Sequence, residues 1–127
     1  MRLSHPRLFF LTSDEAALKE IISNVVPGNV AIVISGIESE SGTTTDFDCG
    51  LATEAMFVAA HGLGLGARIY GGPIGTVNSA RERFQIPAGY RPVMILRIGN
   101  VDKSVDAVSA ATPRKTPEEV VNLYKEK

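Results

Sequence analysis

The sequence predicts an α+β domain in which helices and strands form packed layers (an α/β layered arrangement). Two observations carry this prediction. Apolar runs rich in β-branched residues, "NVAIVIS" at 29–35 and "PVMIL" at 92–96, are typical of buried strands. Between and around them lie segments with helical spacing of apolar residues, so helices and strands alternate along the chain. With 127 residues we expect one domain, spanning 1–127, with four helices and at least three strands.

The first half of the chain provides the first two strands and the first helix of this prediction. "RLFFL" at 7–11 predicts a short buried strand. "TSDE" follows with the spacing of a capping box, in which Thr12 is the N-cap and Glu15 reaches back, so we expect a helix from there through Val25. The segment 29–35 follows a Pro-Gly turn and is predicted to be an interior strand.

The second helix is expected to start near Asp46 or Asp48, as N-cap residues, and to end at His61. Its apolar stripe consists mainly of small residues: Cys49, Ala52, Met56, Ala59 and Ala60. Beyond it we expect a short charged helix in "TVNSARERFQI" at 76–86, a buried strand in "RPVMILRIG" at 91–99 and an amphipathic helix in "TPEEVVNLYKEK" at 116–127. Polar residues 36–46 and residues 99–113 are expected to be irregular connections.

Composition excludes several kinds of partner. The formal net charge is −1, with 13 basic and 14 acidic residues well mixed, which gives no basic face for nucleic acid or an anionic membrane. No apolar run approaches the roughly 20 residues that span a bilayer, and no signal-peptide pattern opens the chain. The one cysteine, Cys49, is expected to be a buried, inert thiol, and a cytoplasmic location is the simplest interpretation. Two histidines far apart in sequence do not predict a metal site.

The stretch "AAHGLGLGARIYGG" at 59–72 is unusually rich in glycine. Gly62, Gly64 and Ala67 fit G-x-G-x-x-A, but a dinucleotide-binding turn follows a strand and opens a helix, whereas here the glycines close one. A left-handed helix C-cap at Gly62 or Gly64 explains one or two of them. For those that follow, the best physical reason is a flat ligand or a partner backbone lying against the main chain.

Three blocks of sequence together resemble the FMN-dependent nitroreductase family. They are "DCGLATEAMFVAAHGLGLG" from Asp48, then "QIPAGYRPVMILRIG", then "PRKTPEEVV", and their order and spacing hold over 48–121. The earlier "HPRLFFLTSDEAALKE" is similar to the family's "Q-P-W-x-F" strand and helix, with His5 at the glutamine position and Arg7 at the tryptophan position. The arginine-rich "RRS-x-R" segment of the family has no counterpart, and Leu3 replaces its asparagine, so we expect a chain truncated at the N-terminus by roughly one third of a usual member.

The resemblance implies a mixed sheet flanked by helices, a homodimer packed through long central helices, and FMN bound at the dimer interface. It places the flavin ring against Gly71 and Gly72, with Tyr70 beside them, and the FMN phosphate on Arg114 and Lys115. The implied activity transfers hydride from NAD(P)H through flavin to a nitroaromatic, quinone or similar small aromatic acceptor. No side-chain acid or base is needed for this, so we assign no catalytic residue.

Three alternatives stay open on the sequence. Tyr70 either borders a flavin or packs in the core, and the two cations at 114 and 115 are either surface charges or phosphate ligands. The chain as a whole is either an FMN-dependent enzyme or a dimeric scaffold that has lost FMN and serves as a binding or regulatory protein.

Overall fold

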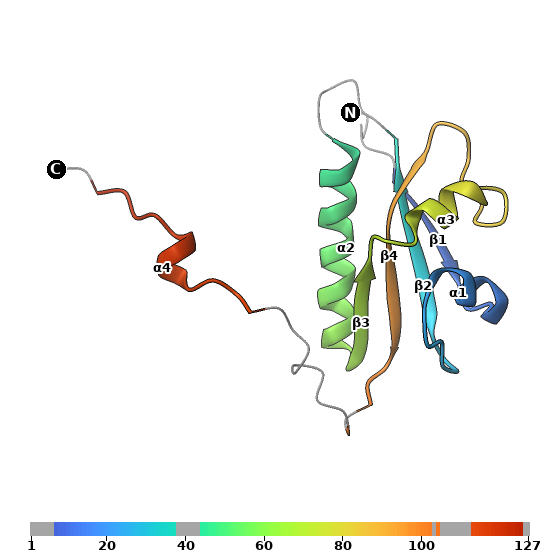
Figure 1. The fold of residues 1–127 in the computed structure, drawn as a ribbon, viewed down its shortest axis with the longest axis horizontal. Coiled ribbons are helices and arrows are strands. Elements are labelled where there is room, and N and C mark those ends of the chain that lie inside the picture. The colour runs from blue at the N-terminus through green and yellow to red at the C-terminus, as the bar shows by residue number, and fades with distance from the viewer. Residues whose placement is uncertain (1–6, 38–43, 103, 105–112, 126–127) are drawn as a thin grey trace.

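Four strands and four helices make up the part of the chain that the computed structural model describes, residues 7–37, 44–102, 104 and 113–125 (Figure 1). In chain order they are β1 (Arg7–Thr12), α1 (Glu15–Ile21), β2 (Val30–Gly36), α2 (Thr45–Gly62), β3 (Leu65–Tyr70), α3 (Ile74–Ser79), β4 (Arg91–Asn100) and α4 (Pro117–Val120). The strands form one sheet in the order β1-β2-β4-β3, and all three pairings are antiparallel. The predicted α+β class is confirmed.

Helices cover both faces of this sheet. Figure 1 shows α2 along one face and α1 with α3 along the other. On the α2 face, Cys49 packs with Ile34 and Leu96 of the two central strands. On the opposite face, Leu18 and Phe84 belong to a larger core cluster, in which the rings of Phe10 and Phe84 meet edge to face at 6.0 Å. The two central strands, β2 and β4, are therefore buried from both sides, which explains their continuous apolar runs.

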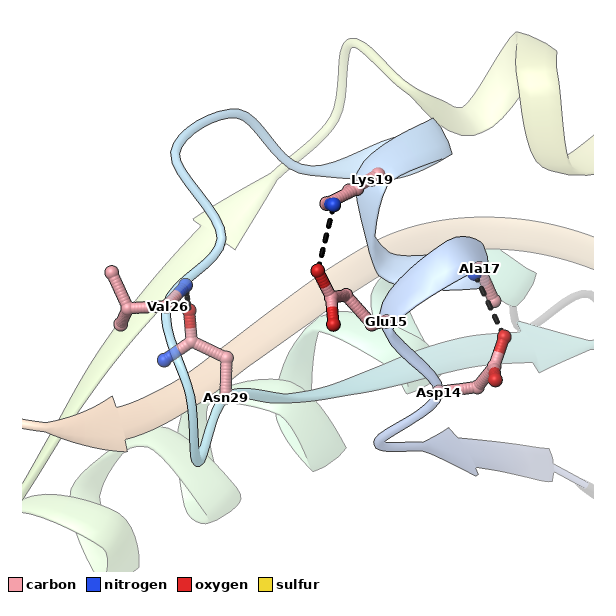
Figure 2. A network of polar contacts seen from close by, with 6 residues as sticks. All are labelled: Asp14, Glu15, Ala17, Lys19, Val26 and Asn29. Carbon is pink, nitrogen blue, oxygen red and sulfur yellow. Dashed lines mark hydrogen bonds and ion pairs between the residues drawn. The ribbon is translucent and has the colours of Figure 1, made fainter.

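The start and the end of the first helix differ from the prediction. Thr12 is the last residue of β1, and Asp14 is the N-cap, whose Oδ2 accepts a hydrogen bond from Ala17 N at 2.9 Å (Figure 2). Thr12 instead uses Oγ1 to accept from Asp14 N at 3.0 Å. The helix ends at Ile21 because the next residue is already extended and Asn24 is left-handed, with φ of 54°. Residues 22–25, which the pattern predicted to be helical, instead form part of the connection to β2.

The second helix is close to the prediction. It runs from Thr45 to Gly62, and its N-cap is Thr44, whose Oγ1 accepts from Phe47 N at 3.2 Å, rather than either aspartate. The aspartates lie in the first turn, where their charge suits the positive end of the helix dipole. Gly64 follows the helix with φ of +78°, so the predicted left-handed glycine cap is confirmed.

The edge strand β3 was not among the strands that the sequence predicted. Residues 65–70 pair with β4 from Leu65 opposite Asn100 to Tyr70 opposite Ile95. The next predicted helix is also shorter and shifted, because α3 covers only Ile74–Ser79 and turns follow it up to Gln85, whose φ is 51°.

The predicted C-terminal helix shrinks to the four residues of α4. Every residue from 113 to 125 is exposed, and Figure 1 shows this segment lying apart from the sheet. A helix of this length needs a packing partner to be stable in water, and this segment has none among the described residues. The predicted connections at 36–46 and 99–113 lie partly outside the described residues. None of the helices described combines the length and hydrophobicity that crossing a membrane would require.

Candidate functional site

The candidate site lies where β3 ends. Tyr70 is the last residue of this edge strand, and Gly71 and Gly72 form the exposed turn that carries the chain away from the sheet into α3. The carbonyl of Gly71 accepts a hydrogen bond from Ile74 N at 3.3 Å, which closes the turn. The N–H groups of the two glycines donate to none of the described residues. The turn therefore presents two free main-chain donors at the surface.

The fold itself does not explain why residues 71 and 72 are glycine. A Cβ built at either position meets nothing within 4 Å, and neither residue is among the left-handed glycines. The same openness holds for Gly75 in α3. By contrast, Gly36 and Gly99 have neighbours within 2.7 Å and 2.5 Å of such a Cβ, so there the protein's own packing demands glycine. At 71 and 72 the main chain is therefore open to close approach by another molecule.

Tyr70 is held in a fixed position beside these glycines. Its ring packs against the core cluster under α1 and α3, and its hydroxyl accepts a hydrogen bond from Arg97 Nη1 at 3.2 Å. The Arg68 guanidinium lies over the ring, 5.0 Å from its centroid. Packing against the core is observed, and a contact of Tyr70 with flavin stays a prediction. The residue also anchors the strand end from which the glycine turn departs.

Arg97 of β4 organises this region. Besides Tyr70, it donates to the carbonyls of Ser23 at 3.0 Å and Asn24 at 2.7 Å. It also donates twice to Asn29 Oδ1, from Nε at 3.1 Å and from Nη2 at 2.6 Å. These bonds use all five N–H groups of the guanidinium. One side chain thus joins the α1–β2 connection, β4 and the end of β3.

Sequence reasoning missed Arg97 and its partners. The available signal was a charged residue inside the apolar run "VMILRIG", which a buried strand tolerates only when the charge is fully hydrogen-bonded. Its acceptors lie at 23–29 and 70, far away in sequence, so the network could not be assembled without the fold.

The two predicted phosphate ligands are not near the glycine turn. Arg114 and Lys115 are exposed and precede α4, in the segment that lies apart from the sheet (Figure 1). Tyr70, Gly71 and Gly72 are consecutive at the end of β3, and these two cations lie elsewhere. Their role as phosphate ligands stays a prediction.

The structure also shows the contacts and exposure of other residues that the sequence analysis considered. Asp46 forms an ion pair with Arg91 at 2.9 Å, which ties the start of α2 to the start of β4. His61 is exposed in the last turn of α2. Cys49 is fully buried, and this burial raises the pKa of its thiol, which favours the inert, protonated form. Within the described residues, no group of three or more histidine, cysteine or acidic side chains is placed to hold a metal ion.

Comparison with known proteins identifies the family. The sequence profile of the nitroreductase family matches residues 17–100. No curated protein sequence matches the chain. Among solved structures, a nitroreductase family protein from Clostridium difficile has a TM-score of 0.68 at 20% identity, over 95% of this chain and 75% of that one.

Two further structures have the same fold. The NfrA1 nitroreductase from B. subtilis has a TM-score of 0.71 at 20% identity, over 91% of this chain and 56% of its own. A nitroreductase with bound FMN from Desulfitobacterium hafniense has a TM-score of 0.68 at 13% identity, over 94% of this chain and 76% of its own. At such identities these structures support the fold, while the profile match covers well over half of the chain. The chain belongs to the nitroreductase family.

Proposed function

We propose that this protein is an FMN-dependent oxidoreductase that transfers hydride from NAD(P)H to a nitroaromatic, quinone or similar small aromatic acceptor. The observation that carries the proposal is the open glycine turn at 71 and 72, whose N–H groups donate to no described residue and whose α-carbons a flat ring can approach. Family membership and the FMN found in the D. hafniense structure support it. The single buried cysteine fits a cytoplasmic setting.

In this proposal the flavin ring lies against the residues at the end of β3. FMN, when bound, supplies the hydride chemistry. The N–H groups of Gly71 and Gly72 would then meet the polar edge of the ring and favour negative charge there, because such donors are already oriented and need no reorganisation. Tyr70, held by Arg97, fixes the strand end from which these donors project.

The phosphate of FMN would be held by Arg114 and Lys115. Both are exposed and unpaired among the described residues, and each can make a charge-assisted hydrogen bond to a phosphate oxygen. Since their segment lies apart from the glycine turn, this role requires that it reach a site formed by the same copy or by a second copy of the chain.

We further propose a homodimer that packs through α2. The face of this helix that points away from the sheet carries Phe47, Leu51 and Val58, which are 62%, 57% and 58% exposed. Their spacing of four and seven residues places them in one stripe, and the sheet-facing residues Cys49 and Thr53 lie on another side. An exposed apolar stripe on α2, the longest of the described helices, is typical of a contact with a second copy.

A second candidate function is a dimeric scaffold that has lost FMN and acts as a binding or regulatory protein. The separation of Arg114 and Lys115 from the glycine turn favours it, because a site without phosphate ligands loses several charge-assisted hydrogen bonds, each worth on the order of 1.5–3 kcal/mol. Flavin affinity distinguishes the two candidates.

The test is a titration of FMN that follows the quenching of its fluorescence. We expect saturable binding that weakens at least about tenfold, roughly 1.4 kcal/mol, when Arg114→Ala and Lys115→Ala are combined. Gly72→Val should abolish binding without loss of thermal stability, because a Cβ at this position meets no atom of the described residues within 4 Å. Gly62→Ala, at another open glycine, is the matched control and should bind normally. Absence of binding at high micromolar FMN would remove the enzymatic proposal and favour the scaffold.

A further inference from the structure

Two arginines face each other across the pairing of β3 with β4. Arg68 and Arg97 are direct register partners, and both lie on the side of the sheet where Tyr70 packs, one over its ring and the other at its hydroxyl. Directly opposed residues of like charge destabilise an antiparallel pair. Neither guanidinium forms an ion pair with a carboxylate of the described residues. The fold thus keeps two positive charges side by side without a paired carboxylate among the described residues.

These charges line a groove of about 240 Å³ at the β3 edge of the sheet. The other polar side chains of its lining are Asn29, Asn100 and Tyr70, and none of the lining residues is acidic. The rest of the lining is apolar or glycine. The groove is smaller than the 300–1,000 Å³ usual for drug-sized ligands, which limits its occupant to a small group.

Asn29 presents a fixed donor to this groove. Only 5% of the residue is exposed, and its Oδ1 accepts from Val26 N at 3.0 Å and from Arg97, which fixes the orientation of the amide. Figure 2 shows Oδ1 turned toward the backbone nitrogen of Val26, with Nδ2 directed away from that nitrogen. Nδ2 donates to no described residue, and it lies 2.5 Å from the position that a Cβ of Gly99 would take. Only glycine at 99 lets the amide lie there.

We propose that this groove is a binding site for an oxyanion, the phosphate or carboxylate group of a small ligand. The five donors of Arg97 are already used within the protein, so this residue contributes charge rather than a new hydrogen bond. Arg68, which makes no hydrogen bond to a described residue, and the Nδ2 of Asn29 supply the donors. A bound anion relieves the repulsion between the two arginines. The groove and the glycine turn adjoin at Tyr70, but the proposal does not rest on flavin binding at Gly71 and Gly72.

The test follows side-chain and backbone amide NMR signals of Asn29 and Gly99 during titration with inorganic phosphate and, separately, with acetate, at constant ionic strength. We expect saturable shifts with at least one of the two, and the anion that saturates identifies the group that the site prefers. Arg68→Gln should weaken binding at least about tenfold, which corresponds to about 1.4 kcal/mol. Arg83→Gln removes the same charge from a surface pair with Glu20 and is the matched control, with affinity unchanged.

A second variant separates anion binding from the structural role of the network. Asn29→Asp keeps an oxygen for Val26 N and Arg97 and places a negative charge in the groove, so we expect a folded protein whose response to the anion is lost. Shifts that never saturate with either anion would overturn the proposal. Equal weakening by Arg68→Gln and Arg83→Gln would also overturn it, because the effect would then come from net charge.

Discussion

Replacing Leu51 by serine should weaken the proposed homodimer without harming the fold of one copy. Leu51 lies on the outer face of α2 and is 57% exposed, so a single chain leaves more than half of this side chain in water. Serine at this position removes the apolar surface, and an exposed helix position tolerates serine. The sheet-facing side of the helix, where Cys49 is fully buried, stays unchanged.

The expected size of the effect follows from that exposure. Burying a whole leucine side chain contributes about 1.5–3 kcal/mol, so burying the exposed half contributes about 1–1.5 kcal/mol. In a symmetric dimer each substitution acts twice. The dimer should therefore lose about 2–3 kcal/mol, which raises its dissociation constant by roughly 30- to 150-fold.

Sedimentation velocity over a range of protein concentrations measures this change directly. Leu11→Ser is the matched control, because Leu11 is 63% exposed on the edge strand β1 and not on α2. We expect the unaltered chain and the control to dimerise alike, and Leu51→Ser to remain monomeric at concentrations where they are paired. An unaltered chain that is monomeric throughout, or equal weakening by the two substitutions, would refute the assignment of α2 as the interface.

Two further predictions concern the fold. Gly99→Ala should destabilise the protein by about 1–3 kcal/mol, because the added Cβ would lie 2.5 Å from Nδ2 of Asn29, a side chain that Arg97 holds in place. Gly75→Ala is the control and should not destabilise the protein, because its Cβ meets no described atom within 4 Å. Chemical denaturation measures the stability of both variants. If both alanines had the same effect, the packing at Gly99 would be wrong. Burial raises the folded-state pKa of the Cys49 thiol. The contribution of this thiol to stability should therefore be fully present below the ordinary pKa of cysteine and lost as pH rises through the raised value. Denaturation of the unaltered chain and of Cys49→Ser at alkaline pH would detect this loss, and the same pH dependence for both would contradict a buried thiol.

The sequence predicted best those elements whose buried side chains follow a long local pattern of apolar residues. The strand at 91–99 corresponds to β4, and the helix that was expected to end at His61 corresponds to α2. β4 is a central strand of the sheet, and Cys49 and Met56 of α2 pack against that sheet, but Ala59 of the predicted stripe is exposed. The class of the fold followed from these elements.

The errors arise where tertiary contacts decide. β3 contains Gly66 and the exposed Arg68, so its local pattern is weak, and its strand form comes from pairing with β4. The C-terminal segment shows the opposite error, because its local pattern predicted a longer helix than the structure has. An amphipathic pattern alone does not stabilise a helix that packs against none of the described residues.

The candidate site was predictable only in part. The open turn at Gly71 and Gly72 was indicated by the excess of glycine, since a close approach is what glycine permits. The Arg97 network was not indicated, because its acceptors come from the connection between α1 and β2 and from β3. Such a network exists only after the sheet has formed.

Anaerobic reduction of FMN tests the central claim most directly. The protein is mixed with FMN in the absence of oxygen, NADPH or NADH is added, and the loss of the visible flavin absorbance is followed. The account predicts that the protein reduces FMN much faster than the nucleotide does alone, that Gly62→Ala retains this rate, and that Gly72→Val loses it, since only the latter blocks the turn at the end of β3. Bleaching no faster than that of free FMN, or equal rates for both variants, would contradict a flavin oxidoreductase built on this turn.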